Sequence, residues 1–336
     1  MSALASIKRD KLRIGFLGTG RIGIRRMRSL IESGLIEAVA VADPTPEMVD
    51  AALELAPEAE PVDGLDGLLA HDLDGVVIAT PSALHAAQSI ATFDAGLAVF
   101  CQKPLGRTEE EVAAVVEASQ RADRLLGVDL SYRHTMGMNR IRDLTRRGGL
   151  GEVFGIDLAF HNAYGPDKPW FFDKQLSGGG CVMDLGVHMV DLALWALDFP
   201  DVVSATGHLF SHGRPIARDS DTVEDYATAT MTLATGTVVR LTCSWHLHAG
   251  RDAVIEADFY GTEGGASLKN LNGSFLDFAA WHHTKTASQQ LAEPESTWPG
   301  GAALEWAQKL AAGTRFDPAA HDFIKVSAVL DRIYAR

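Results

Sequence analysis

The sequence of 336 residues has few cysteines, a deficit of basic side chains and no long apolar run. Its three cysteines include no CxxC pair, which excludes a disulfide framework and is typical of a reduced, intracellular protein. Lys and Arg number 30 against 44 Asp and Glu, giving a formal net charge of −14. Because this charge repels phosphate backbones and anionic membrane surfaces, we expect neither nucleic acid nor a membrane as a partner.

No segment is predicted to enter a membrane. The N-terminal residues MSALASIKRDK contain no apolar stretch of signal-peptide length, and no later segment is predicted to span a bilayer. The sequence therefore predicts a cytoplasmic protein.

Short apolar runs alternate with helix-like segments through the first 130 residues. The apolar runs, which are typical of buried parallel strands, cover residues 12–18, 37–43, 74–80, 97–101 and 125–130. The helical patterns between them cover residues 21–34, 46–56, 82–95 and 108–124. This α/β alternation predicts right-handed crossovers and a doubly wound parallel sheet of the Rossmann type.

The pattern changes after residue 150. Strand-like alternation with glycine turns covers residues 151–163, 223–249 and 252–280, and helical patterns cover 182–197, 301–312 and 319–334. The polar stretch 283–300, with two prolines, is predicted to be a loop. We therefore expect a C-terminal α+β domain with a large, mostly antiparallel open sheet. The expected division is residues 1–131 for the Rossmann domain and 132–336 for the α+β domain, with the C-terminal helix able to pack back on the first domain.

A glycine motif opens the first predicted helix. Gly18 permits a tight turn, Gly20 lets a pyrophosphate approach the backbone, and Gly23 lets the helix pack closely on the strand. Asp43 ends the second predicted strand, where a carboxylate accepts hydrogen bonds from adenosine ribose hydroxyls. Since a carboxylate there repels a 2′-phosphate, we expect NAD as the cofactor and consider NADP the less favoured alternative.

Four ordered motifs carry a resemblance to a known family. They are GFLGTGRIG at residues 15–23, ATPSALH at 79–85, CQKPL at 101–105 and GGGCVMDLGVHMVDLALW at 178–195. In this combination the sequence resembles the glucose–fructose oxidoreductase/inositol dehydrogenase (Gfo/Idh/MocA) family. The resemblance implies a Rossmann domain followed by a domain with a large open sheet. It also implies an NAD(P)-dependent oxidoreductase acting on a hydroxyl or carbonyl of a sugar, sugar derivative or inositol-like polyol.

The resemblance also implies roles for individual residues. The active-site lysine of the family falls on Lys103, and its Asp-x-x-x-His pair falls on Asp184 and His188. The residues expected to contact the cofactor are Gly18, Gly20, Arg21, Ile22, Gly23, Asp43, Thr80, Pro81, His85, Gln102 and Lys103. Gln102 departs from the family, which usually has Glu there, so this side chain can form hydrogen bonds but carries no charge.

The chemistry of the three catalytic candidates fits hydride transfer. An ammonium at Lys103 would stabilise the negative charge that develops on the substrate oxygen. His188 could remove the hydroxyl proton as a general base, since imidazole titrates near neutral pH. Asp184 lies one helical turn before His188, so it could orient the imidazole or bind a substrate hydroxyl.

Further substrate contacts are expected from Arg133, His161, Tyr164 and Trp170, together with Asp184 and His188. The Asp-x-x-x-His pair could instead hold a metal with His161 or with His246 and His248, but the sequence offers no clear third and fourth ligand. We therefore expect no metal.

Three alternatives to a simple dehydrogenase stay open. One is an NAD(P)-binding regulatory protein without catalysis, which the resemblance permits and Gln102 leaves possible. The others are an enzyme that reduces an imine or tetrapyrrole, and an enzyme that retains its cofactor and alternates oxidation with reduction. An open sheet with one exposed face suggests subunit pairing, and the resemblance implies a homodimer or homotetramer formed through it. The apolar residues considered for its contact are Val238, Leu241, Val254 and Ile255.

Overall fold

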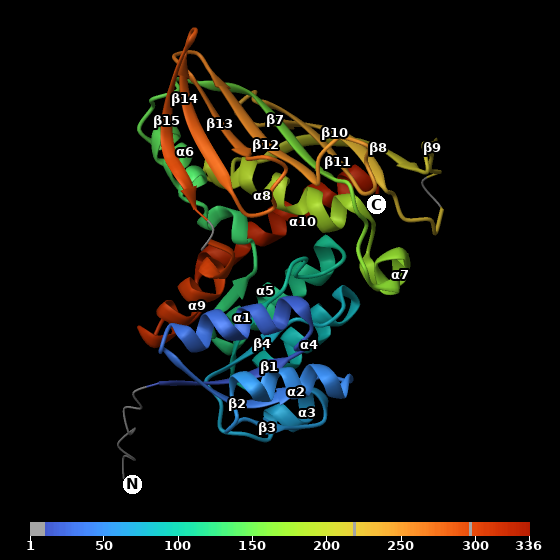
Figure 1. Cartoon of the computed structure of the whole chain (residues 1–336), viewed down its shortest axis with the longest axis vertical. Coiled ribbons are helices and arrows are strands. Elements are labelled where there is room, and N and C mark those ends of the chain that lie inside the picture. Colours follow the sequence, from blue (N-terminus) through green and yellow to red (C-terminus); the bar gives the residue numbers. More distant parts are fainter. Residues whose placement is uncertain (1–10, 218–219, 296–297) are drawn as a thin grey trace.

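Two sheets lie one above the other with helices between them (Figure 1). The computed structural model describes residues 11–217, 220–295 and 298–336. Residues 1–10, on which most of the expectation about a signal peptide rests, lie outside the described residues. The lower sheet in Figure 1 comes from the first part of the chain and the upper sheet from the second.

The first sheet has the parallel strand order β3-β2-β1-β4-β5-β6, which confirms the predicted doubly wound fold. Its strands are β1 (Leu12–Leu17), β2 (Ile36–Ala42), β3 (Glu60–Pro61), β4 (Gly75–Ile78), β5 (Ala98–Cys101) and β6 (Leu126–Val128). Its helices are α1 (Arg21–Glu32), α2 (Pro46–Leu55), α3 (Gly64–Leu69), α4 (Ser82–Asp94) and α5 (Glu109–Ala122). The order reverses between β1 and β4, and the carboxyl ends on either side of this point form the edge where such sheets bind ligands.

The second sheet has the order β15-β14-β13-β12-β7-β11-β10-β8-β9. Its strands are β7 (Val153–Asn162), β8 (Val202–Ser211), β9 (Arg214–Pro215), β10 (Tyr226–Leu233), β11 (Val238–Ser244), β12 (Ala253–Gly261), β13 (Gly265–Asn270), β14 (Phe278–Thr284) and β15 (Ala287–Glu295). The pairing of β7 with β11 is parallel and all other pairings are antiparallel, as the sequence predicted.

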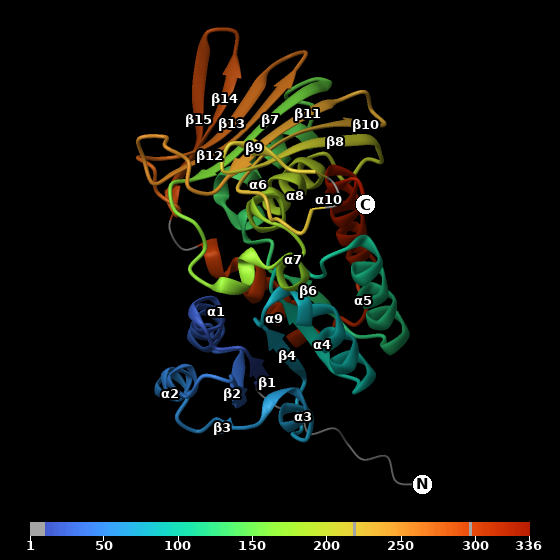
Figure 2. The ribbon, with the colours of Figure 1, turned by 90° about the vertical axis from the view of Figure 1, so that its right-hand side faces the viewer.

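Helices cover one face of this second sheet. They are α6 (Met136–Arg146), α8 (Val187–Ala196) and α10 (His321–Tyr334), which lie between the sheet and the Rossmann part (Figures 1 and 2). On β12 the covered face carries Ile255 and Phe259, which are fully buried, whereas Glu256 between them points to the open face. The sheet is therefore open on the side away from the Rossmann part.

Two elements of the Rossmann part were not predicted. Strand β3 pairs only Glu60 and Pro61 with β2, and α3 has six residues of which two are glycine. Segments this short do not show the periodicity from which an element is recognised.

The predicted loop 283–300 is wrong, because β15 pairs with β14 over most of that range. Strand β15 lies at the edge of the sheet, where exposed polar residues and a proline are tolerated, and Pro294 is found there. Helix α6 was missed because only Gly137, Met138 and Ile141 of its residues are buried in an otherwise polar sequence. Strand β8 was missed because only Ala205 of its residues is buried and apolar Val203 is 68% exposed, which breaks the alternation expected of a strand.

One segment is long and apolar enough to pass as a membrane-spanning helix, although none was predicted. Lys174–Ala196 has the length and hydropathy of a membrane-spanning helix, contrary to the prediction, but 94% of its most apolar stretch is buried. Within it, every residue of α8 is buried. The apolar composition is thus explained by packing between the sheet and neighbouring helices.

The C-terminal helices contact both parts of the chain. Helix α9 (Gly301–Ala311) packs Ala303 and Trp306 into a core cluster with Phe16 and Phe100 of the Rossmann sheet. The rings of Trp306 and Phe100 lie 5.8 Å apart between centroids. Helix α10 contacts both α5 and β8. The relative placement of the two sheets is therefore fixed by burial of apolar side chains.

Candidate active site

The three glycines after β1 differ in what surrounds them. Gly18 has φ +85°, and a Cβ there would lie 2.6 Å from the carbonyl oxygen of Ala79. A Cβ on Gly23 would lie 2.0 Å from the carbonyl oxygen of Gly18. A Cβ on Gly20, in contrast, would have no atom within 4 Å. Gly18 and Gly23 are thus required by the turn and the helix packing, whereas the backbone at Gly20 is open to a ligand.

The N-terminus of α1 faces the same opening. Gly20 is the N-cap and provides no side-chain cap, and the first turn contains no acidic residue. Arg21 is exposed and Ile22 half-buried. The first N–H groups of α1 are therefore available to an anion, and the positive end of the helix dipole favours a phosphate there.

Asp43 is held beside the glycine turn. Its Oδ2 accepts a hydrogen bond from the backbone N–H of Thr19 at 2.8 Å, and its Oδ1 accepts one from Thr45 at 2.9 Å. Each carboxylate oxygen keeps a second acceptor position. The glycine turn, the helix N-terminus and this carboxylate together fit a dinucleotide with ribose hydroxyls near Asp43.

His85 joins the loops that follow β4 and β5. Its side chain is buried, with Nε2 2.7 Å from the carbonyl oxygen of Thr80 and Nδ1 2.6 Å from that of Pro104. Burial lowers the pKa of His85, while the two carbonyl groups act in the opposite direction. Both ring nitrogens are engaged, so His85 holds the two loops together, and its contact with the cofactor stays a prediction. Thr80 and Pro81, half-buried at the same edge, stay accessible.

Lys103 and Asp184 connect the two parts of the chain. Lys103 follows β5, and its Nζ donates to both Oδ1 and the backbone oxygen of Asp184 at 2.6 Å. The other carboxylate oxygen of Asp184 accepts a hydrogen bond from Nε1 of Trp245 at 3.0 Å. Since an ammonium group has three donors, one N–H of Lys103 is left for a substrate oxygen.

His188 lies next to this pair in a buried position. Its ring packs edge-on against Tyr132, with centroids 4.8 Å apart, and its Nδ1 is buried with no hydrogen-bond partner among the described residues. Burial, and then the positive charges of Lys103 and Arg26, hold the pKa of His188 well below its ordinary value of 6.5. The imidazole is therefore neutral near pH 7 and able to accept a proton.

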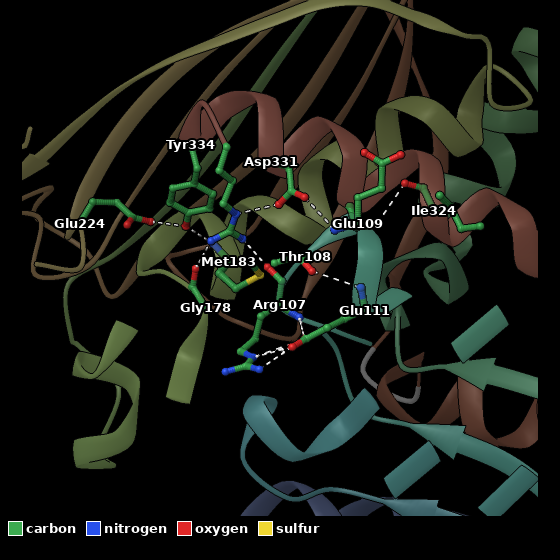
Figure 3. Close-up of polar contacts among 12 residues, drawn as sticks. Arg107, Thr108, Glu109, Glu111, Gly178, Met183, Glu224, Ile324, Asp331 and Tyr334 are labelled. Atoms are coloured by element: carbon green, nitrogen blue, oxygen red, sulfur yellow. Dashed lines mark hydrogen bonds and ion pairs between the residues drawn. The ribbon is translucent and has the colours of Figure 1, made fainter. Parts of the chain in front are cut away.

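The N-terminus of the helix that carries Asp184 and His188 is held by the buried carboxylate of Glu224, whose contact with Tyr334 is drawn in Figure 3. Glu224 accepts hydrogen bonds from the backbone N–H groups of Gly180 at 3.0 Å and Val182 at 2.9 Å. The Tyr334 hydroxyl donates to Glu224 at 2.7 Å and accepts from the N–H of Met183 at 3.2 Å. These contacts fix the π-helical turn Val182–Gly186, from which Asp184 reaches Lys103.

The end of α10 also ties this helix to the Rossmann part. Asp331 accepts a hydrogen bond from the N–H of Glu109 at 2.7 Å, as Figure 3 shows. Arg336 donates to the backbone oxygen of Gly178 at 2.8 Å and to that of Arg107. The last residues of the chain thus link the start of α5 to the glycines that precede the helix.

Two of the expected substrate residues lie elsewhere. Arg133 donates from Nε to Asp191 at 2.7 Å and packs over the ring of Phe199, so its guanidinium is engaged in the fold. His161 alternates along β7 with the buried Phe160, which faces the helices, and so lies on the open face of the sheet. Its Nδ1 is 2.8 Å from Oγ of Ser244 on the same face. Both side chains are thus engaged in contacts within the fold, and their role in substrate binding stays a prediction.

The loop after β7 contains the other two candidates. Tyr164 is 57% exposed and its hydroxyl donates to Asp252 at 2.8 Å. Trp170 stacks on Phe171 at 3.8 Å between centroids, and Phe171 packs edge-on against Trp245. Trp170 is thus connected to the site through aromatic contacts. Helix α7 (Lys174–Ser177) continues this loop between the two sheets (Figure 2).

Two residues of the site, Trp245 and Tyr132, were not predicted from the sequence. Trp245 lies just past β11 and its contact to Asp184 spans 61 residues, so no local pattern indicated it. Tyr132 follows β6, close to the carboxyl edge that the sequence did predict. No group of three or more His, Cys, Asp or Glu side chains within residues 11–217, 220–295 and 298–336 could hold a metal ion.

Comparison with known proteins gives one family for both parts of the chain. A model described as "Oxidoreductase family, NAD-binding Rossmann fold" matches residues 12–130, and one described as "GFO/IDH/MocA C-terminal domain" matches residues 138–267. D-glucoside 3-dehydrogenase of Escherichia coli (strain K12) is 28% identical over 269 residues, which cover 76% of this chain and 77% of that protein.

Solved structures show the same fold. GenD2 from gentamicin A biosynthesis, in complex with NAD, has a TM-score of 0.82 at 23% identity, covering 100% of this chain and 96% of that one. Levoglucosan dehydrogenase, in complex with NADH and levoglucosan, has a TM-score of 0.80 at 21% identity, covering 97% and 96%. At these identities the likeness establishes the architecture of both domains.

Proposed function

The chain belongs to the GFO/IDH/MocA family of NAD-binding oxidoreductases, and we propose that it transfers a hydride between NAD and a hydroxyl-bearing carbon of a sugar or polyol. The observation that carries this proposal is the contact of Lys103 with Asp184 beside the neutral, buried His188. A cation and a neutral base close together suit an alcohol oxygen that loses a proton as its carbon loses a hydride.

We assign one task to each residue in the oxidising direction. His188 accepts the proton of the substrate hydroxyl. The free N–H of Lys103 donates to the same oxygen as the oxygen becomes a carbonyl. Asp184 fixes the ammonium from the side, while Trp245 fixes Asp184. NAD, when bound, supplies the acceptor for the hydride; Gly20, the N-terminus of α1 and Asp43 would hold its phosphates and ribose.

Substrate class is supported by the named activities of the relatives. A D-glucoside dehydrogenase and a levoglucosan dehydrogenase both act on carbohydrates by their names. Turnover with saturating NAD should be measured on glucosides, free hexoses, anhydrosugars and inositols. We expect NADH formation with members of this panel and, with NADH in place of NAD, no NADH oxidation with imines; turnover confined to a non-carbohydrate substrate would contradict the proposed class.

Asp43 is expected to set the preference for NAD. In Asp43→Ser the Kd for NAD should rise about 10–100-fold, because a hydrogen bond to a charged group contributes about 1.5–3 kcal/mol. The Kd for NADP should fall relative to that for NAD, because the 2′-phosphate no longer meets a carboxylate. Titration calorimetry with both cofactors measures this change. Asp94→Ser, at the exposed far end of α4, is the control and should leave both constants unchanged. An unaltered NAD/NADP ratio in Asp43→Ser would contradict the assignment.

The pH dependence should report His188. The pKa of His188 is lowered, so its neutral form persists below pH 6.5 and is lost only as the pH falls through that lowered pKa. The acidic limb of kcat/KM for oxidation is therefore expected below pH 6.5. A pH profile at saturating NAD measures it, and a limb centred above pH 6.5 would rule out His188 as the base in this environment.

The regulatory alternative differs in one outcome. A protein that binds NAD without catalysis would show cofactor affinity but no turnover with any substrate. The polar contacts around Lys103 favour the enzyme, because a purely structural lysine does not require a buried, unpaired imidazole nearby.

We further propose the domain division 1–131 and 132–336 and a homodimer or homotetramer that uses the open face of the second sheet. The six-stranded and nine-stranded sheets fall on opposite sides of this division, although α9 joins the first core. Leu241 and Ile255 are buried against the helices and are removed from the contact. Val238 and Val254 lie on the open face and remain as candidates, together with the exposed Tyr260 on the same face, and sedimentation equilibrium would measure the subunit number.

A further inference from the structure

A buried polar cluster lies where β5 and β6 end. Asp129 follows β6 and is 1% exposed, and Arg26 reaches it from α1 with 8% exposure. Arg26 Nε donates to Oδ2 of Asp129 at 2.5 Å, the Gln102 amide donates to the same oxygen, and the Ser131 hydroxyl donates to Oδ1. One carboxylate thus receives three donors and is balanced by one guanidinium.

The contacts of the cluster require the negative charge at residue 129 and a hydrogen-bond donor at residue 102. An ionised carboxylate only accepts hydrogen bonds, so the group at residue 102 has to be a donor as long as residue 129 is Asp. A second carboxylate at residue 102 would place two negative charges against one guanidinium in a buried space, which is unfavourable unless one is protonated. The amide of Gln102 is therefore matched to the carboxylate of Asp129.

Gln102 is also fixed through its backbone, directly before Lys103. Its N–H donates to the carbonyl oxygen of Ile78 at 2.8 Å, and the N–H of Asp129 donates to that of Cys101 at 2.9 Å. The side chain of Gln102 is thus held from β6 while its backbone is held from β4. The direction in which the chain presents Lys103 to Asp184 depends on both contacts.

We propose that Gln102, Asp129 and Arg26 form a unit that positions Lys103, and that the donor at residue 102 and the carboxylate at residue 129 can be exchanged only as a pair. Arg26 Nε and the Gln102 amide donate to the same oxygen. If residue 102 were Glu and residue 129 were Asn, the carboxylate at residue 102 would still lie next to Arg26. The amide at residue 129 could then donate a hydrogen bond to it. The predicted change in kcat rests on the proposed function.

A double-mutant cycle tests this exchange. Gln102→Glu and Asp129→Asn should each lower kcat about tenfold or more, with the KM for the sugar or polyol changed less than about threefold, because Lys103 is displaced. The double variant should recover kcat to within about threefold of wild type. Gln120→Glu, the same change at an exposed position of α5, is the matched control and should match wild type.

Each outcome decides the proposal. If Gln102→Glu is insoluble alone and the double variant is soluble and active, the rescue supports the exchange. Losses that simply add in the double variant would overturn it, as would single variants with wild-type kcat. Wild-type turnover reports separately on the proposed function. Should the wild type be inactive, that function fails, and the free energies of unfolding of the four proteins then test the pairing, with recovery in the double variant expected and additive losses contradicting it.

Discussion

Replacing Lys103 by methionine is expected to lower kcat by about 10²–10⁴ while NAD binds with nearly unchanged affinity. Methionine keeps most of the length of the side chain but removes the charge and all three donors. The contacts at 2.6 Å to Asp184 are lost, and the substrate oxygen loses the cation that stabilises its developing charge. Steady-state kcat and KM, with the Kd for NAD from calorimetry, measure the effect.

The controls for Lys103 separate chemistry from folding. Lys11→Met, at an exposed position before β1, should have wild-type kinetics. Because Asp184 keeps its hydrogen bond from Trp245, the Lys103 variant should remain folded. A Lys103→Met protein with kcat within about threefold of wild type would remove this lysine from the active site.

Replacing His188 by asparagine is expected to lower kcat by a similar factor, about 10²–10⁴. Asparagine is polar and fits the buried site beside Tyr132, but it cannot accept and hold a proton near neutral pH. The acidic limb of the wild-type pH profile should disappear together with the activity. Kinetics across pH, in the variant and in wild type, measure both effects.

The control for His188 is His208→Asn, an exposed histidine on β8. It should retain the wild-type rate and pH profile. If His188→Asn lost activity but kept the same acidic limb, another group would be the base and His188 would only shape the site. Unfolding by denaturant should accompany the kinetics, because a buried substitution also changes stability.

The sequence predicted the Rossmann part well because its signals are local. Each strand is a short apolar run, each helix has its own periodicity, and Gly18 and Gly23 are demanded by backbone geometry that any such turn imposes. Lys103 follows a predicted strand, so its position on the carboxyl edge was predictable as well. Strand β15 was not, because edge strands carry the polar residues and prolines that otherwise indicate loops.

The substrate side was harder to predict because it depends on contacts between distant residues. The pairing of Arg133 with Asp191 decides where that guanidinium points, and no pattern near Arg133 reveals it. For His161 a signal was present: alternation with Phe160 places it on the opposite face of β7 from the helices. The carboxylate at Asp129 could also have been noted, since it lies near the carboxyl end of a predicted strand at the same edge as Lys103.

Transfer of a labelled hydride tests the central claim most directly. A sugar or polyol from the panel, carrying deuterium on the carbon whose hydroxyl is oxidised, should be incubated with the wild-type protein and NAD. The account predicts reduced cofactor that contains the deuterium, formed at least about 100-fold more slowly by Lys103→Met. Cofactor that binds but is never reduced, or reduced cofactor without deuterium, would contradict hydride transfer at the site formed by Lys103, Asp184 and His188.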